Sequence, residues 1–187
     1  MRVFIAVDIN DEMRRELTRI QNVLSGKLVN AKWVKPQNLH ITIKFLGEIE
    51  PEAVGDITLS LEKPIKETPS FYIELGELGV FPNMKRPAVF WAGLKKGREE
   101  MSRLNELIQN SLYQIGYEKD SKPFSPHITL ARFRKPVPSN QIVKAIESVS
   151  PIKKAGHTIN GVSIYESTLK PKGPEYKHVK YTTFAAQ

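Results

Sequence analysis

The chain has 187 residues, of which 40% are hydrophobic and 26% charged; this composition is ordinary for a globular protein, and the length allows one domain with a substantial core. Twenty-eight Lys and Arg against 20 Asp and Glu give a net charge of +8, which favours polyanionic partners such as nucleic acid, and the absence of cysteine excludes disulfides and thiolate chemistry. Because no apolar run reaches the roughly 18 residues of a membrane helix, and Val3–Val7 is too short for a signal peptide, we expect a cytoplasmic protein without membrane association.

The first part of the chain predicts the order strand, helix, strand, helix, strand. The apolar run Val3 to Ala6 predicts a strand, and apolar residues at helical spacing then run from the cap candidates Asn10 and Asp11 to Gly26. The run His40 to Gly47 alternates with the period of two that is typical of a half-buried strand. A second helical pattern opens at Pro51, and a strand from Phe71 to Leu75 follows it.

The second part of the chain repeats this order. The predicted elements are a strand at Val89 to Ala92, a helix between Gly97 and Gly116, a strand at His127 to Phe133, a helix from Pro138, and a strand at Thr158 to Tyr165. The two central strands read HITIKFLG and HITLARF, and their histidines are 87 residues apart (127 − 40 = 87). This recurrence indicates an internal duplication, with halves of approximately 1–86 and 87–187 forming a single bilobed domain.

Each repeated strand presents an imidazole beside a hydroxyl. On the two-residue period His40 and Thr42 project from one face, as do His127 and Thr129. Two imidazoles that titrate near neutral pH suffice for phosphodiester cleavage, one removing a proton from the attacking oxygen and the other protonating the leaving oxygen. Hydroxyl groups between them can hold the phosphoryl oxygens. A lone histidine more often has a structural role, but the recurrence of the pair favours the catalytic interpretation.

Metal binding is the competing chemistry for two histidines. A catalytic zinc site normally has three protein ligands, and neither motif carries a carboxylate within its core, so we expect no metal and no other cofactor. His157 and His178 have no equivalent partners, which favours surface or structural roles for them. The sequence also has no P-loop and no glycine-rich dinucleotide fingerprint.

The paired motifs, together with MRVFIAVDI, WVKPQNLHITIKFLG, RPAVFWAG, SPHITLARF and YESTLKPKGPEY, resemble the two-histidine phosphoesterase superfamily. Within it the chain is similar to the RNA 2′,3′-cyclic phosphodiesterases, also called 2′-5′ RNA ligases, over nearly its whole length. The resemblance implies an α+β fold with two pseudo-twofold-related lobes. Each lobe would be a mainly antiparallel sheet with helices packed on it, and the active site would lie in the cleft between them.

The same resemblance implies the activity and the site residues. The enzyme would hydrolyse 2′,3′-cyclic phosphate ends of RNA or nucleotides to 2′-phosphomonoesters without a cofactor, and the reverse ATP-independent 2′-5′ ligation would use the same groups. His40 would be the proton donor and His127 the proton acceptor, and Thr42 and Thr129 would contact the phosphate. We expect a monomer.

Two basic residues near the motifs are harder to place. In a regular strand Arg132 is out of phase with His127 and would face away, unless a bulge re-aims it, whereas Lys44 is in phase with His40 and would meet RNA or solvent. Both are therefore left outside the catalytic set. The alternative function that remains is a non-catalytic basic RNA-binding protein that uses the same cleft, and mutation of either histidine would separate the two.

Overall fold

A computed structural model describes residues 1–171 and 173–185 of the chain. In chain order the elements are β1 (Arg2–Asp8), α1 (Asp11–Ser25), β2 (Ala31–Trp33), the 3₁₀ helix η1 (Pro36–Asn38), β3 (His40–Glu48), α2 (Ala53–Lys66), β4 (Phe71–Phe81), β5 (Val89–Lys96), α3 (Arg98–Tyr113), β6 (Ile128–Phe133), α4 (Ser139–Val149), β7 (Gly156–Ile159), β8 (Gly161–Lys170) and β9 (Gly173–Thr183).

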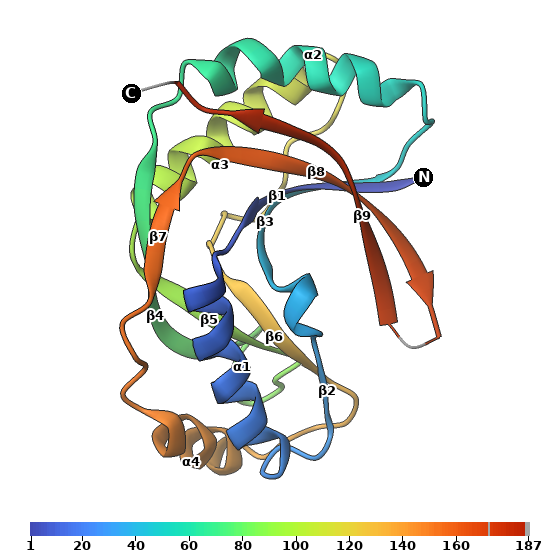
Figure 1. Cartoon of the computed structure of the whole chain (residues 1–187). Coiled ribbons are helices and arrows are strands. Elements are labelled where there is room, and N and C mark those ends of the chain that lie inside the picture. Colours follow the sequence, from blue (N-terminus) through green and yellow to red (C-terminus); the bar gives the residue numbers. More distant parts are fainter. Residues whose placement is uncertain (172, 186–187) are drawn as a thin grey trace.

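The strands form one nine-stranded sheet in which every pairing within the described residues is antiparallel (Figure 1). The order is β7-β4-β5-β6-β3-β1-β8-β9, with β2 added on β6. The order is nearly symmetric about the neighbouring strands β6 and β3. Outward from β6 lie β5 and then β4, and outward from β3 lie β1 and then β8. The mainly antiparallel α+β fold with two related lobes is therefore confirmed, although the lobes share one sheet.

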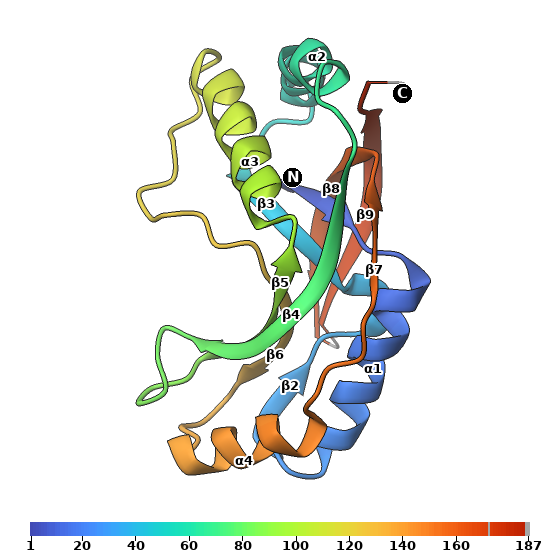
Figure 2. The ribbon, with the colours of Figure 1, turned by 90° about the vertical axis from the view of Figure 1, so that its left-hand side faces the viewer.

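The two lobes do not coincide with the two halves of the sequence. α2 and α3 lie together at one end of the molecule and α1 and α4 at the other, so each helical pair takes one helix from each half (Figures 1 and 2). Likewise β4 pairs with β5, and β8 pairs with β1. The strand that closes each half is thus incorporated into the lobe of the other half, which ties the lobes together.

Helix positions follow from caps and apolar spacing. Of the two cap candidates, Asn10 caps α1, since its side chain accepts a hydrogen bond from the Met13 amide at 3.0 Å, and Asp11 is the first residue of the helix. Before α3, Gly97 has φ +86°, and a Cβ there would come within 2.7 Å of the Tyr72 carbonyl, so glycine is required at this turn. The apolar stripe of each helix is buried against the sheet.

The predicted strand at Thr158 to Tyr165 is wrong as a single element, because it is two strands. Only Asn160 separates β7, which pairs with β4, from β8, which pairs with β1 near the opposite end of the sheet order. The sheet must therefore curl until its two ends approach each other. The alternation of polar and apolar residues along one strand contains no information about this curl. Gly161 permits the crossing, since a Cβ would lie 2.4 Å from the Thr182 carbonyl. Strands β2 and β9 were not predicted.

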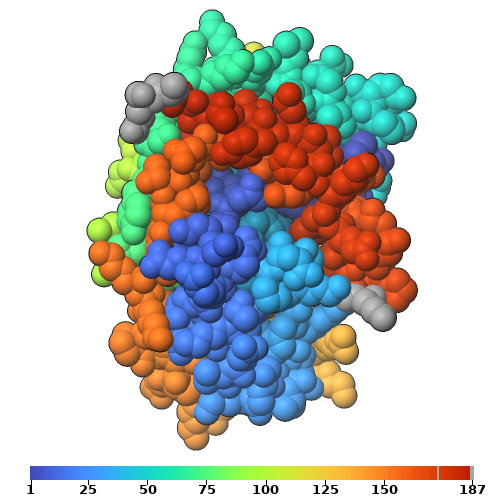
Figure 3. Space-filling model, in the orientation of Figure 1, coloured from blue at the N-terminus to red at the C-terminus, as the bar shows by residue number. Residues whose placement is uncertain are grey.

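The C-terminal strand β9 packs against helix α2. In the space-filling view the red strand β9 lies directly against the teal helix α2 (Figure 3). Within the described residues, none of the helices has the length and apolar character needed to cross a membrane.

Candidate active site

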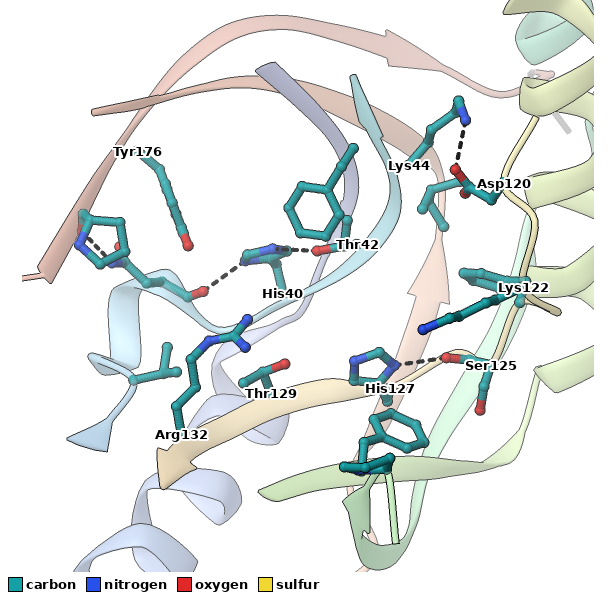
Figure 4. A pocket seen from close by; sticks show the side chains of 18 of the residues that line it. His40, Thr42, Lys44, Asp120, Lys122, Ser125, His127, Thr129, Arg132 and Tyr176 are labelled. Carbon is teal, nitrogen blue, oxygen red and sulfur yellow. Dashed lines mark hydrogen bonds and ion pairs between the residues drawn. The ribbon is translucent and has the colours of Figure 1, made fainter. Parts of the chain in front are cut away.

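His40 and His127 stand at the start of the two central strands and line one cavity. β3 begins at His40, and β6 begins directly after His127. The residue pair that joins these strands, Ile41 with Ile128, consists of the next residue in each. The strands therefore meet beside both histidines, and the two distant copies of the motif face a common space (Figure 4).

The threonines of the two motifs line the same space. An antiparallel register through the joining pair places each histidine across from the threonine of the other copy. The Thr42 hydroxyl lies 2.9 Å from His40 Nε2, and the Thr129 side chain, labelled in Figure 4, faces the same cavity. Four polar side chains thus surround one position at which a phosphate can be bound.

Each imidazole is oriented by the backbone carbonyl two residues before it. His40 Nδ1 is 2.7 Å from the Asn38 carbonyl, and His127 Nδ1 is 2.7 Å from the Ser125 carbonyl. Because a carbonyl can only accept a hydrogen bond, Nδ1 must carry the proton in both rings. The Nε2 atom of each ring is then the one that can exchange a proton with a substrate.

The 3₁₀ helix before His40 is held from two sides. The Arg14 guanidinium of α1 donates to the carbonyls of Pro36, at 2.6 Å, and Ile9, at 3.1 Å. The Asn38 side chain donates to the Pro174 carbonyl of β9 at 2.9 Å. These contacts fix the segment whose carbonyl sets the orientation of His40.

Aromatic side chains support both rings. The Phe4 ring stacks on His40 with a centroid distance of 4.9 Å, and the Tyr176 ring meets it edge-on at 5.4 Å. On the other side the Phe81 ring meets His127 edge-on at 4.9 Å. These contacts limit rotation of the imidazoles and remove part of their surface from water.

Burial governs the protonation of both histidines. It lowers the pKa of His40 below its ordinary value, and the hydrogen bond to Asn38 and the charge of Asp8 partly offset this effect. Burial also lowers the pKa of His127, the Ser125 carbonyl opposes the shift, and the positive charge of Arg132 lowers the pKa further. Both imidazoles of the free protein therefore favour the neutral form near pH 7.

A bulge in β6 turns Arg132 into the cavity. β5 pairs Phe90 with Ala131 but Trp91 with Thr129, so Leu130 is an extra residue on β6. Leu130 and the following residue are both fully buried, and the alternation is shifted by one from there on. Arg132 consequently lies on the same side as Thr129, with its guanidinium directed toward the space between the motifs (Figure 4).

A corresponding bulge in β3 turns the Lys44 ammonium away from the two histidines and toward Asp120, at the border of the cavity. In the ladder between β1 and β3, Ile5 pairs with Lys44 and Ala6 pairs with Thr42. Ile43 is therefore the extra residue of β3. Lys44 is 4% exposed, and its ammonium lies 2.9 Å from an Asp120 carboxylate oxygen. The expectation that Lys44 meets RNA or solvent is therefore wrong, because the bulge reverses the face that it occupies.

Three further side chains of the cavity were not recognised from the sequence. Phe45 occupies in β3 the position that Arg132 occupies in β6, and it is 66% exposed. A gapless alignment of the two motifs places Phe45 at the position of Arg132, so the sequence contains the signal that Phe45 lines the cavity. Tyr176 of β9 and Lys122 of the loop before β6 also point into the cavity (Figure 4), and because both come from outside the motifs, no local signal identifies them.

The cavity has a volume of about 800 Å³ and a basic lining. Five cationic side chains contribute to it, and the one acidic residue among its described lining residues, Asp120, is paired with Lys44. The four others make no ion pair within the described residues; they are Lys32, Lys35, Lys122 and Arg132. Such a site favours an anionic ligand.

The remaining histidines lie outside the cavity lining. His157 Nε2 is 3.2 Å from the Asp8 carbonyl, and His178 is exposed with its ring edge-on to Tyr165. Across residues 1–171 and 173–185, no three His, Asp or Glu side chains are grouped so that they could hold a metal ion.

This arrangement can transfer two protons around one bound phosphate. Each Nε2 can take up or release a proton, and hydroxyl groups and a guanidinium are placed to contact phosphoryl oxygens. A phosphodiester that enters the cavity would therefore have a base, an acid and charge-stabilising groups around its phosphorus.

Comparison with known proteins identifies related chains. The family model described as LigT like phosphoesterase matches residues 7–91 and 93–176. The RNA 2′,3′-cyclic phosphodiesterase of Thermotoga maritima is 34% identical to this chain over 179 residues, which cover 95% of this chain and 92% of the relative. The RNA 2′,3′-cyclic phosphodiesterase of Archaeoglobus fulgidus is 33% identical over 180 residues, covering 96% and 98%.

A solved structure shares the whole fold. The crystal structure of TT0787 from Thermus thermophilus superposes with a TM-score of 0.82 at 28% sequence identity, and the match covers 98% of this chain and 97% of the other. The family resemblance drawn from the paired motifs is confirmed by these matches.

Proposed function

The chain belongs to the LigT like phosphoesterase family, and from this premise we propose that it is an RNA 2′,3′-cyclic phosphodiesterase. The observation that carries the proposal is the paired geometry of His40 and His127. Two rings with the same Nδ1 anchor, on strands that meet beside them, direct both Nε2 atoms toward one substrate, and that of His40 also contacts the Thr42 hydroxyl. A protein that only binds RNA has no need for two rings oriented in this way.

The proposed reaction is attack of water on the cyclic phosphate. His127 Nε2 removes a proton from the water as the new P–O bond forms, which is favoured because the lowered pKa of His127 keeps it neutral. The P–O3′ bond breaks, and His40, which must enter the step as the imidazolium, gives the proton on its Nε2 to the departing 3′ oxygen. The products are a 2′-phosphomonoester and a free 3′-hydroxyl.

The negative charge on the phosphoryl oxygens requires stabilisation during this step. We assign this role to the hydroxyls of Thr42 and Thr129, which lie beside the two imidazoles. Arg132 supplies a guanidinium that suits phosphoryl oxygens. A regular strand would keep Arg132 outside the site, and the bulge in β6 is the reason to include it.

The same groups support 2′-5′ ligation of RNA. If the 5′-hydroxyl of a second RNA strand replaces the attacking water, the product is a 2′-5′ phosphodiester, and no ATP is consumed because the cyclic phosphate supplies the energy. The proposal also includes three properties of the whole protein. The halves 1–86 and 87–187 arose by internal duplication, the protein is a monomer, and it is located in the cytoplasm.

The experiment that tests the proposal uses short RNAs that end in a 2′,3′-cyclic phosphate. After incubation with the protein, mass spectrometry detects opening of the ring, and chromatography against authentic 2′-phosphate and 3′-phosphate standards identifies the terminal group. A 2′-phosphate end supports the proposal. Binding without turnover would instead show a non-catalytic RNA-binding protein, and a 3′-phosphate end would show that the 2′ oxygen leaves.

A further inference from the structure

The bulge that brings Arg132 into the site depends on an unusual carbonyl. Leu130, the extra residue of β6, is not matched by a residue of β5, yet it is fully buried. Its carbonyl oxygen accepts a hydrogen bond from the Val34 amide at 2.9 Å. It also accepts a second one, from the side-chain amide of Gln21 at 3.0 Å.

Gln21 lies on the buried face of α1, far from β6 in sequence. It is 5% exposed, and its Nε2 group donates both to the Leu130 carbonyl and to the Val34 carbonyl, the latter at 2.8 Å. One amide therefore joins α1, the bulge and the segment after β2. Burial of a polar side chain is costly unless its hydrogen bonds are made, and here both N–H groups are used.

Strand β3, which carries His40, has a bulge that is supported in the same way. Ile43, the extra residue of β3, has its carbonyl bonded by the side-chain amide of Asn105 at 2.9 Å. Asn105 is 6% exposed and lies on α3, the helix of the other lobe that corresponds to α1. Two bulges, each supported from a helix by a buried amide, indicate a common requirement of the two strands.

We infer that Gln21 is a positioning residue for Arg132: its amide holds the β6 bulge that turns the guanidinium toward the substrate phosphate. This inference rests on the proposed function and adds a residue to it. Without the amide, the Leu130 carbonyl keeps its bond to Val34, so the strand still pairs. The extra residue, however, loses its support, and relaxation of the register by one residue would carry Arg132 to the opposite face.

A double-mutant cycle tests this inference with nucleoside 2′,3′-cyclic phosphate as substrate. Arg132→Ala should lower kcat/KM by about ten- to a hundredfold, the range for losing a charged hydrogen bond to phosphate. Gln21→Met, which keeps the length of the side chain but removes both donors, should lower kcat/KM by about three- to tenfold. In the double variant the loss should equal that of Arg132→Ala alone to within about twofold, because Gln21 acts through Arg132.

The matched control is a buried polar residue of the same helix. Glu16 is 6% exposed and pairs with Arg19, away from the cavity. Glu16→Gln can reduce stability, but it should leave kcat/KM unchanged. Asn105→Leu is a second control: because it supports the other strand, its effect should persist in full in the Arg132→Ala background.

Additive losses for Gln21→Met and Arg132→Ala would overturn the inference. If Gln21→Met does not fold, Gln21→Leu replaces it, since this substitution also removes both donors. A crystal structure of the folded variant gives a readout independent of turnover: Arg132 is expected to leave the cavity, and its unchanged position would contradict the proposal. Failure of the proposed function is distinguishable, because it would appear as absent turnover by the wild-type protein.

Discussion

The ammonium of Lys44 and a carboxylate oxygen of Asp120 form an ion pair of 2.9 Å behind the strand that carries His40. The ammonium also donates to the side chain of Gln109 at 3.0 Å and to the carbonyl of Glu118 at 2.9 Å. The Lys44 side chain is 3% exposed, whereas that of Asp120 is 46% exposed. The pair anchors the loop that leads to His127, so one strand presents the first histidine and secures the approach to the second.

The unequal burial of this pair predicts unequal effects of removing its partners. Asp120→Asn leaves a buried ammonium without its countercharge and should cost about 1–3 kcal/mol of the free energy of unfolding. Lys44→Met leaves a carboxylate that water can reach, and it should cost about 1 kcal/mol or less. Urea denaturation measures both. The exposed pair Glu62–Lys66 is the control, and a larger effect of Lys44→Met would contradict the assignment.

Replacement of either histidine tests the shared site. His40→Ala or His127→Ala should lower kcat by roughly 10²- to 10⁴-fold, the usual range for losing one general acid or base. If the two rings act on one phosphate, as proposed, the double variant should lose much less than the product of the single losses. Steady-state kinetics on an RNA 2′,3′-cyclic phosphate measures this. Near wild-type turnover by either single variant would exclude the mechanism.

The two proton-transfer roles can be separated with a modified substrate. If sulfur replaces the bridging 3′ oxygen, the leaving thiolate needs no proton, so the acid becomes dispensable. This substrate should restore turnover to His40→Ala but not to His127→Ala. Restoration of His127→Ala instead would exchange the roles of the two histidines while leaving the paired mechanism intact.

The lowered histidine pKa values predict an acidic optimum for the free enzyme. The acid must be protonated and the base neutral, so kcat/KM should follow a bell whose two limbs are set by the pair. Burial lowers both pKa values below the ordinary 6.5, and the maximum should therefore lie on the acidic side of that value. A pH series of kcat/KM measures it, and a maximum well above pH 7 would contradict the assigned burial effect.

The ligand set predicts independence from metal ions. The two motifs supply two histidines, whereas a catalytic zinc normally has three protein ligands. Turnover should survive prolonged treatment with EDTA, and added divalent cations should act only by screening the RNA. Loss of turnover in EDTA that zinc restores would move the protein to the metal-assisted class.

The sequence by itself determined the fold class, the family and the candidate pairs His40–Thr42 and His127–Thr129. Local pattern sufficed for the candidate pairs because alternating polarity and the repeated motif are properties of neighbouring residues, whereas the fold class was implied by the family resemblance. The same patterns gave positions for β1, α1 and α3 that are close to the observed bounds. A short apolar run marks the strand, and a buried apolar stripe between end signals marks each helix. The acid and base roles came from the family resemblance, because the two motifs are too alike to be told apart.

Only the tertiary structure decided which basic side chain enters the site. A period of two assigns Lys44 to the strand face of His40 and Arg132 to the face opposite His127, and both assignments are reversed by one extra residue in each strand. Bulges form where distant groups satisfy the displaced carbonyls, here Gln21 for β6 and Asn105 for β3. Since those groups lie on helices far away in the sequence, the face that each strand presents after its bulge is a property of the folded chain.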